Sequence, residues 1–316
     1  MKRISTKSII SISILLLTCC GIVYYLSLHQ ELLNSLWKIS LTQVVVLIIL
    51  RTLYTSTYGL FLKISIAKLH IRLKPREWFG LPFITTMGNQ LTPFAGGVIM
   101  RAVYLKQRHS LSYAQFATLL FANHLITFWV AGCIGILTCV FSPHLGPARW
   151  ILAIFFSIVV VVIAIIVSLP PYSLSGQNLL IKTINNFFEG WSILKDDKTL
   201  LILVTLIAFI GVMLNGLSFG VAFYAIDLNV LPQTVLLVSL LPFFLILIYI
   251  TPGNLGVQEI IISITSGFLG TGLGKGLLVA LLIRATTLIP VFSLGMIYSI
   301  LLANDLKGKS GSETIL

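Results

Sequence analysis

The sequence predicts an all-α, polytopic membrane protein, and two observations support this fold class. Of the 316 residues, 57% are hydrophobic and only 9% are charged, with a mean hydropathy of +1.03; a soluble domain carries about 25% charged residues. Several apolar runs reach the ~20 residues that a helix needs to cross the hydrocarbon core, and they lack the alternation of barrel strands. We therefore expect one integral membrane domain over residues 1–316, with 9–303 in the membrane and 304–316 as a short cytoplasmic tail.

The charge balance predicts how the chain sits in the membrane. It has 21 Lys and Arg residues against 9 Asp and Glu. In a membrane protein this excess indicates basic loops on the cytoplasmic side, and we expect no nucleic-acid partner. The inner (cytoplasmic) membrane, with both termini in the cytoplasm, is the expected location. The four cysteines lie in apolar runs without a Cys-x-x-Cys pair, so we expect neither a metal nor a cofactor.

Six full spans are predicted along the chain. The first follows a basic N-terminus, and we interpret it as an uncleaved span rather than a signal peptide. Basic residues crowd together between Lys63 and Arg76, after the second span, and this indicates the cytoplasmic side. The fourth span is uncharged and rich in Val, Ile and Phe, so we expect it to face lipid. The spans cover about 9–28, 39–62, 113–141, 150–169, 200–225 and 276–302.

Two further apolar segments, Trp78–Phe94 and Val235–Leu273, are interrupted by proline and glycine. The first has basic residues on both sides, so it enters and leaves from the cytoplasm, and the crossing count makes the second start and end outside. The two share the pattern Thr-Pro-x-x-x-Gly-Val, at 92–98 and 251–257. We predict re-entrant or broken hairpins that form an inverted repeat and meet near the midplane. Eight full spans are the alternative.

A further amphipathic stretch lies between the fourth and fifth spans. Residues 180–194 place apolar side chains at helical spacing, with polar side chains elsewhere. This pattern fits an interfacial helix on the cytoplasmic face, and an ordinary cytoplasmic loop is the alternative.

The shared motif suggests an anion site. A Thr-Pro pair suits a helix start, because Thr can cap with its hydroxyl and Pro fits the first helical position. We therefore predict two half-helices inside the membrane, at Thr92-Pro93 and Thr251-Pro252, whose N-termini bind an anion. The glycines of both motifs would let the backbone approach a ligand; the alternative is a pair of simple kinks packed against their neighbours. These glycines are Gly96, Gly97, Gly253 and Gly256.

Four charged residues lie in or beside apolar runs: Arg51, Arg101, Glu259 and Arg284. Each would cost about 2.5–3.5 kcal/mol at the centre of a lipid-exposed helix. If they converge, three cations and one anion leave a positive cavity suited to a phosphate-bearing headgroup. In the alternative, Glu259 pairs with one arginine structurally and the other arginines extend to the interface. Asn123-His124 in the third span could add polar contacts.

Two motifs carry a family resemblance. They read Pro-x-x-Gly-Gly-x-x-x-Arg from Pro93 to Arg101 and Pro-Gly-x-x-Gly-x-x-Glu from Pro252 to Glu259, and Arg51 and Arg284-Ala285 fall where the family tends to have arginine. The chain thus resembles the transmembrane region of the lysylphosphatidylglycerol synthase family, which is flippase-like, over about residues 10–305.

The chain departs from that family pattern in its third span. Where the family commonly has Glu-Arg and a later Asp, this chain has Asn123-His124 and Thr127. This departure predicts a difference from other members in the substrate or in the coupling of transport. Because the chain ends soon after its last span, we also expect no soluble aminoacyl-transferase domain.

The resemblance implies a transporter that moves an anionic or glycosylated lipid between leaflets of the bacterial inner membrane. Its expected partners are a phospholipid or a lipid-linked glycan, with envelope-biosynthesis proteins as further candidates. A membrane glycosyltransferase, or an accessory subunit in envelope polysaccharide or lipid synthesis, is the alternative. The sequence contains no Gly-x-Ser-x-Gly, His-Glu-x-x-His or P-loop motif, so we expect a transporter rather than an enzyme.

Overall fold

The computed structural model describes residues 38–92, 95–168, 197–247 and 251–313, together with five isolated residues: 20, 24, 27, 31 and 181. Within these ranges all regular structure is helical, which confirms the predicted fold class. The predicted first span lies outside the described residues, apart from Cys20, Tyr24 and Ser27. The predicted amphipathic stretch 180–194 also lies outside them, apart from Ile181.

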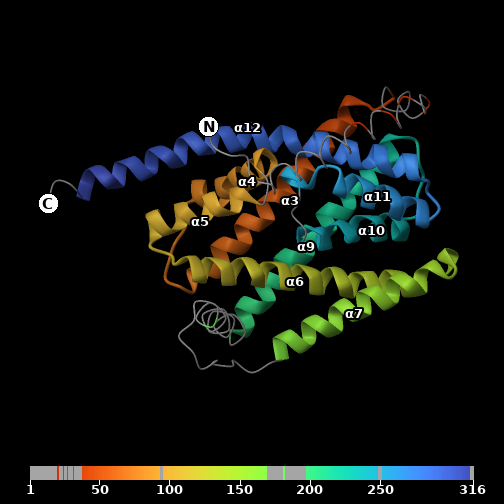
Figure 1. Ribbon diagram of the computed structural model, residues 1–316, viewed down its shortest axis with the longest axis horizontal. Helices are drawn as coiled ribbons and strands as arrows, with labels where there is room; N and C mark the ends of the chain where they lie inside the picture. The colour runs from red at the N-terminus through yellow and green to blue at the C-terminus, as the bar shows by residue number, and fades with distance from the viewer. Residues whose placement is uncertain are drawn as a thin grey trace, which may run out of the picture.

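Five described helices are long and apolar enough to cross a membrane. They correspond to the second to sixth predicted spans and run along the bundle in Figure 1. The first two of them flank the first interrupted segment, and a short 3-10 helix, η1 (Pro143–Leu145), joins the second helix to the third. The five helices are α3 (Leu41–Ala67), α6 (Tyr113–Val140), α7 (Ala148–Ser168), α9 (Lys198–Ala225) and α12 (Leu273–Glu313).

Local capping explains where three of these helices begin. The Ser40 hydroxyl accepts a bond from the Gln43 backbone N–H at 3.2 Å, and the Gln43 side chain accepts one from the Ser40 backbone N–H at 2.9 Å. Ser112 and Gln115 repeat this reciprocal arrangement at the start of α6. At α9 the Asp197 carboxylate accepts from the Leu200 N–H at 2.9 Å. Each cap satisfies backbone donors that a helix start leaves without partners.

Ion pairs and hydrogen bonds show which helix termini share an end of the bundle. At one end Lys68, just after α3, pairs with Asp197 at the start of α9. At the opposite end Lys38 Nζ lies 3.5 Å from Oδ2 of Asp227, which comes just after α9. We call the end that holds Lys68 the basic end, because the basic cluster between Lys63 and Arg76 lies there.

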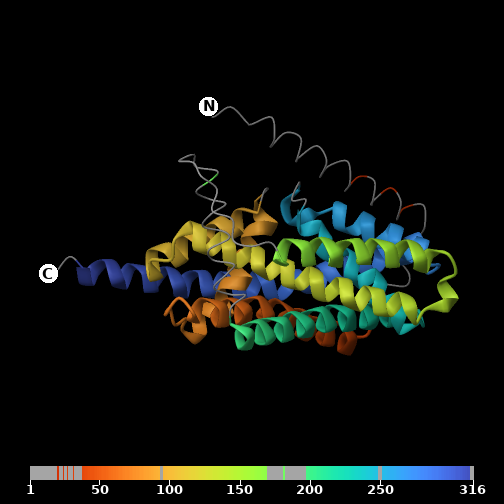
Figure 2. The ribbon, with the colours of Figure 1, turned by 90° about the horizontal axis from the view of Figure 1, so that it is seen from below.

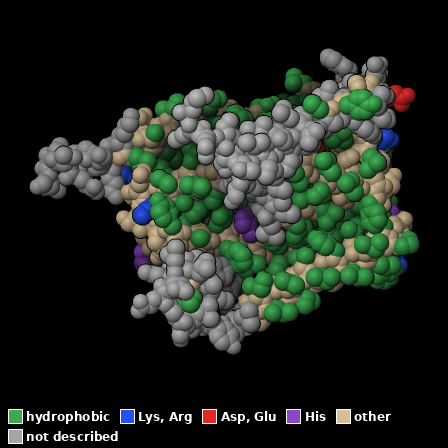
Figure 3. Space-filling view, viewed as in Figure 1, with side chains coloured by type: hydrophobic (Ala, Val, Ile, Leu, Met, Phe, Trp, Pro, Cys, Tyr) green, Lys and Arg blue, Asp and Glu red, His purple; other side chains and the backbone are tan. Residues whose placement is uncertain are grey.

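The outer surface of the bundle is apolar between its two ends. In Figure 3 hydrophobic side chains cover the middle of the visible face, and charged side chains gather toward its ends. Helix α7 carries much of this surface: Ile151, Ile154, Ile158 and Ile165 are each more than half exposed. This exposure agrees with the prediction that the fourth span faces lipid. Figure 2 shows α3 and α9 side by side on the opposite edge, where they pack closely.

The first interrupted segment forms part of a broken hairpin of two helices, α4 (Pro75–Leu91) and α5 (Gly96–His109). The predicted bounds, Trp78–Phe94, cover only the first helix, and the second comes from the basic stretch that follows. Both outer ends lie at the basic end, because α4 begins shortly after α3 and α5 ends shortly before α6. An Arg108 N–H also donates to the Asp305 carbonyl of α12 there, at 3.3 Å. The helices have 17 and 14 residues, fewer than the ~20 that a span needs.

The second interrupted segment forms a matching hairpin from the opposite end (Figure 1). Its pieces are α10 (Pro232–Leu240), the 3-10 helices η2 (Leu241–Leu247) and η3 (Pro252–Asn254), and α11 (Val257–Phe268). Each piece is too short to span, so the structure favours two hairpins over eight full spans. The two tips meet: a Cβ added at Gly253 would lie 1.8 Å from Gln90 Oε1 of α4. The predicted meeting of the two broken segments is confirmed.

Candidate functional site

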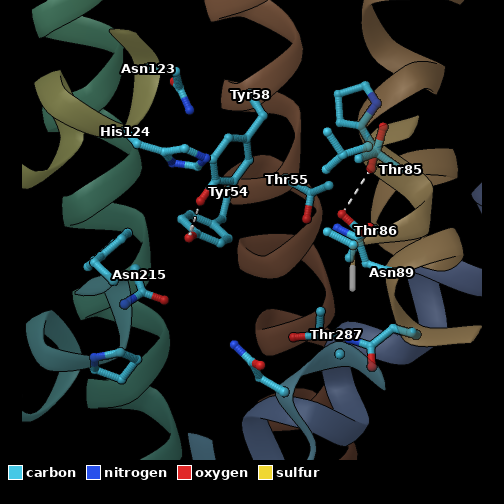
Figure 4. Close-up of a pocket in the computed structure, with 18 of the residues that line it drawn as sticks. Tyr54, Thr55, Tyr58, Thr85, Thr86, Asn89, Asn123, His124, Asn215 and Thr287 are labelled. Carbon is cyan, nitrogen blue, oxygen red and sulfur yellow. Dashed lines mark hydrogen bonds between the residues drawn. The ribbon is translucent and has the colours of Figure 1, made fainter. Parts of the chain in front are cut away.

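A cavity of about 450 Å³ lies where the two hairpin tips meet. Its walls come from α3, α4, α5, α6, α9 and α12, with Gly253 and Asn254 of η3 at the second tip. The volume falls within the range of about 300–1,000 Å³ that is typical of ligand pockets. Figure 4 shows polar side chains around it that belong to α3, α4, α6, α9 and α12. Among the described residues, three arginines, one histidine and no Asp or Glu line the cavity.

Arg101 of α5 carries a buried charge toward this cavity. Its side chain is only 8% exposed, and its guanidinium carbon lies 5.7 Å from the centre of the Phe116 ring. Among the described residues its Nε atom has no hydrogen-bond partner. A buried donor on a charged group is costly when it is left without an acceptor. The position therefore favours an anionic acceptor supplied by a ligand.

Arg51 of α3 is held by neutral groups. Its Nε donates to Thr287 Oγ1 at 2.9 Å, and its Nη1 donates to Asn215 Oδ1 at 2.7 Å. The guanidinium carbon lies 4.5 Å from the centre of the Tyr54 ring. These contacts orient the side chain and partly satisfy its donors, but they supply no full negative charge.

Arg284 of α12 is neutralised. Its Nε donates to the carboxylate of Glu259, and Nη1 donates at 3.2 Å to both Gln90 Oε1 and the Gly253 carbonyl. The second oxygen of Glu259 accepts from the Gly256 backbone N–H at 2.7 Å. Both carboxylate oxygens of Glu259 thus have a partner, which agrees with the alternative that this residue pairs structurally with one arginine.

The remaining charge of the cavity is positive. Glu259 offsets Arg284, so Arg51 and Arg101 face the cavity without a carboxylate partner among the residues that line it. They are 7% and 8% exposed, which shows that they do not extend to the membrane surface as the alternative expected. Two guanidinium groups in a partly apolar cavity form a strong site for a phosphate or another anion.

The sequence matches the lysylphosphatidylglycerol synthase TM region family over residues 7–295. The chain belongs to this family. No curated protein matches it. Membership makes this chain a membrane protein of lipid or envelope metabolism, and it confirms the resemblance carried by the two proline-glycine motifs.

In this member of the lysylphosphatidylglycerol synthase family, Thr92 does not cap the second half of its hairpin. Its hydroxyl donates to the Gly88 carbonyl at 2.6 Å, and the residue ends α4. Helix α5 begins only at Gly96, after Ala95 in the left-handed region, so the predicted helix start was wrong. Thr back-bonds of this kind compete with capping. Pro93 lies outside the described residues.

Thr251 and Pro252 do not begin a half-helix either. Pro252 is the first residue of η3, a single 3-10 turn, and the Thr251 hydroxyl donates to the Leu255 carbonyl at 2.8 Å. The half-helix α11 starts at Val257. There the Glu259 carboxylate, rather than a threonine, accepts a hydrogen bond from the Gly256 backbone N–H. The predicted helix start at Thr251-Pro252 was therefore wrong, and one backbone N–H at the actual start of α11 already donates to a carboxylate.

The glycines of the first motif serve helix packing rather than ligand approach. A Cβ at Gly97 would lie 1.9 Å from the Thr85 carbonyl oxygen of α4, and one at Gly96 would lie 2.3 Å from Thr92 Oγ1. Neither glycine lines the cavity. In the second motif Gly253 lines the cavity, and Gly256 has a φ of 91°, which favours glycine in the turn before α11.

The structure adds cavity residues that the sequence reasoning did not single out. The hydroxyl groups of Tyr54 and Tyr58 form a hydrogen bond of 2.6 Å, and Asn215 lies within the apolar helix α9. Polar side chains inside apolar runs were the available signal, and among the uncharged and histidine residues it identified only Asn123 and His124. The missed residues shown in Figure 4 are Tyr54, Thr55, Tyr58, Thr85, Thr86, Asn89, Asn215 and Thr287.

A second buried acid links the outer ends of the two helices of the first hairpin. Glu77 at the start of α4 accepts from the Tyr104 hydroxyl at 2.8 Å and from the Lys74 backbone N–H at 2.7 Å, and it lies 2.9 Å from His109 Nε2. Burial raises the pKa of Glu77, but hydrogen bonds from His109, the Lys74 N–H and Tyr104 outweigh burial and hold the pKa at about 2. The cluster joins the outer ends of α4 and α5.

Proposed function

We propose that this protein moves a lipid with an anionic headgroup between the leaflets of the inner membrane, with the headgroup bound in the cavity. Family membership supports a role in lipid or envelope metabolism. The mixed wall of the cavity supports an amphipathic cargo, because aromatic side chains such as Phe61, Phe219 and Phe243 line it together with arginine and amide groups.

The observation that carries the proposal is the buried, unpartnered donor of Arg101 in a cavity whose described walls hold no acid. A structural arginine would be neutralised, as Arg284 is by Glu259. A phosphate oxygen would complete the hydrogen bonding of Arg101 and compensate the charge of Arg51. The headgroup would thus cross the bundle as a bound anion.

The hairpin geometry supports a route for such a cargo. The α4–α5 hairpin enters from the basic end and the α10–α11 hairpin from the opposite end, and their tips close the cavity between them. Displacement of either tip alone would open the cavity toward one side, which is the requirement for alternating access. The excess of basic residues supports a cytoplasmic location for the basic end.

Proteoliposomes with a fluorescent phospholipid test the proposal, because an impermeant quencher reports movement between leaflets. We expect Arg101→Gln to slow the exchange of an anionic phospholipid at least about tenfold, equivalent to ~1.4 kcal/mol. Lys106→Gln is the matched control: it removes the same charge from α5 at an exposed position outside the cavity.

Three outcomes would count against the proposal. Exchange at the same rate with and without the protein would refute it. Equal slowing by Arg101→Gln and Lys106→Gln would show that net charge, not the cavity, matters. Sugar transfer from an activated donor to a lipid by the purified protein would favour the glycosyltransferase alternative.

A further inference from the structure

Two buried amide oxygens in the cavity lack hydrogen-bond donors. Asn89 of α4 and Asn254 of η3 are 8% and 6% exposed, and both line the cavity. Neither Oδ1 atom has a partner among the described residues, although the Asn254 amide nitrogen donates to the Leu245 carbonyl at 3.2 Å. A buried acceptor without a donor is costly, because nothing replaces the hydrogen bond that it makes in water. Groups that donate hydrogen bonds are therefore expected in the cargo.

The α4 wall adds further acceptors to the same side of the cavity. The Thr85 hydroxyl donates its hydrogen to the Leu81 carbonyl at 2.7 Å, and the Thr86 hydroxyl donates to the Pro82 carbonyl at 2.9 Å. The two hydroxyl oxygens keep lone pairs that can accept a bond. Figure 4 shows Thr85, Thr86 and Asn89 along one helix face, so this wall offers acceptors in a row.

Hydroxyl and ammonium groups could both donate to these acceptors, and charge distinguishes them. The described walls hold Arg51, Arg101 and Arg284 but no Asp or Glu. Glu259, which offsets Arg284, already accepts from this arginine and from the Gly256 N–H. An ammonium group would enter a positive cavity with no free carboxylate, and like charges in a poorly solvated site repel strongly.

We infer that the headgroup of the cargo combines a phosphate with neutral hydroxyl groups, as in a phosphoinositol or phosphoglycosyl lipid, and that the cavity discriminates against aminoacylated lipids. This inference rests on the proposed function and deepens it. The phosphate lies at Arg101 and Arg51, and the hydroxyls donate to Asn89 and Asn254. The absence of acid from the described walls sets the selectivity against cationic headgroups.

The test compares four fluorescent lipids in the same proteoliposomes. Phosphatidylinositol offers phosphate and hydroxyls, phosphatidic acid phosphate alone, glucosyl diacylglycerol hydroxyls alone, and lysylphosphatidylglycerol a phosphate with ammonium groups. We expect phosphatidylinositol to cross fastest, at least about tenfold faster than lysylphosphatidylglycerol, which corresponds to ~1.4 kcal/mol. Soluble inositol phosphate serves as a competitor and, in radiolabelled form, as a candidate cargo.

Two substitutions probe the assigned groups. Asn89→Leu should lower the ratio of the phosphatidylinositol rate to the phosphatidic acid rate, and Gln107→Leu, at an exposed site on α5, should not change it. Asn123→Asp, which is nearly isosteric, adds a carboxylate to the cavity wall. We expect this variant to raise the rate for lysylphosphatidylglycerol relative to phosphatidylinositol.

The outcomes separate the inference from the function on which it rests. If lysylphosphatidylglycerol crosses as fast as phosphatidylinositol, the inference is wrong and lipid transport stands. Equal rates for phosphatidylinositol and phosphatidic acid would refute the role of the hydroxyl groups. If no lipid crosses, the proposed function itself fails; transport of inositol phosphate alone would identify a soluble anion as the cargo.

Discussion

Glu259, which is buried, and Arg284, which is mostly buried, form an ion pair that holds the tip of the second hairpin in place. The carboxylate caps the start of α11 through Gly256, and the guanidinium of α12 bonds the carbonyl of Gly253 and the side chain of Gln90 on α4. One arginine thereby connects α12, both hairpins and the edge of the cavity. Because the two side chains compensate each other's charge, the main contribution of the pair is to position the two hairpin tips.

Replacing one partner of this pair should destabilise the protein more than replacing both. Glu259→Gln leaves the Arg284 charge buried without a carboxylate, and breaking a buried pair costs about 3–5 kcal/mol. The double substitution Glu259→Gln with Arg284→Met removes both charges, so its loss should be smaller. Thermal unfolding in detergent measures both effects. A double variant as unstable as the sum of the two single variants would show that the residues are not coupled.

Much of the fold could be predicted because membrane spans depend on local composition. The predicted spans 113–141 and 200–225 agree closely with α6 and α9, since long apolar runs are sufficient to define them. The hairpins followed from proline and glycine inside short apolar segments and from the crossing count. The extension of α12 to Glu313 was not predicted, because its last residues are polar and leave the apolar run.

The site was only partly predictable because its pairing is decided in three dimensions. The sequence identified Arg51, Arg101, Arg284 and Glu259 as expensive charges, but not which arginine Glu259 would neutralise. That choice depends on the packing of α11 against α12, which are separated by a turn of few residues. Similarly, the Thr-Pro motif suggested helix starts, whereas both threonine hydroxyls bond to carbonyl groups instead.

The Glu77 cluster should make the first hairpin sensitive to acid. The pKa of this carboxyl is about 2 in the folded protein, below its ordinary value of 4.5. A lowered carboxyl pKa contributes stability that is complete above about pH 4.5 and is lost as the pH falls toward 2. We expect Glu77→Gln to lower the unfolding temperature at pH 7 by roughly 5 °C, because a buried hydrogen-bonded charge is lost.

The difference between the wild type and Glu77→Gln should shrink progressively from pH 4.5 to the lowest pH at which the protein stays in solution. Thermal unfolding across this range provides the measurement. Tyr104→Phe removes one donor to the carboxylate and should give a smaller loss of the same sign. A difference that is independent of pH would show that Glu77 acts through packing and not through its charge.

Labelling from outside the cell tests which end of the bundle faces the cytoplasm. Lys275, at the start of α12, and Arg76, at the start of α4, are exposed residues at opposite ends. In a cysteine-free background we expect Lys275→Cys to react with an impermeant thiol reagent in intact cells. Arg76→Cys should react only after the membrane is permeabilised. The reverse pattern would invert the proposed orientation, while reaction of both in intact cells would contradict the crossing count.

Close packing at Gly97 predicts that the first hairpin tolerates no side chain there. A Cβ would lie 1.9 Å from the Thr85 carbonyl oxygen and 2.8 Å from the Asn89 backbone nitrogen, and neither backbone atom can move without shifting α4. We expect Gly97→Ala to lower the unfolding free energy by about 1–3 kcal/mol and to slow lipid exchange, because Asn89 and Arg101 would separate.

Gly220→Ala is the control for this prediction: the nearest neighbour of the added Cβ would be Val235 Cγ1 at 3.8 Å, an ordinary contact. This second change should be neutral or slightly stabilising, since alanine favours a helix interior. Equal losses in both variants would show that packing between α4 and α5 is not what Gly97 provides.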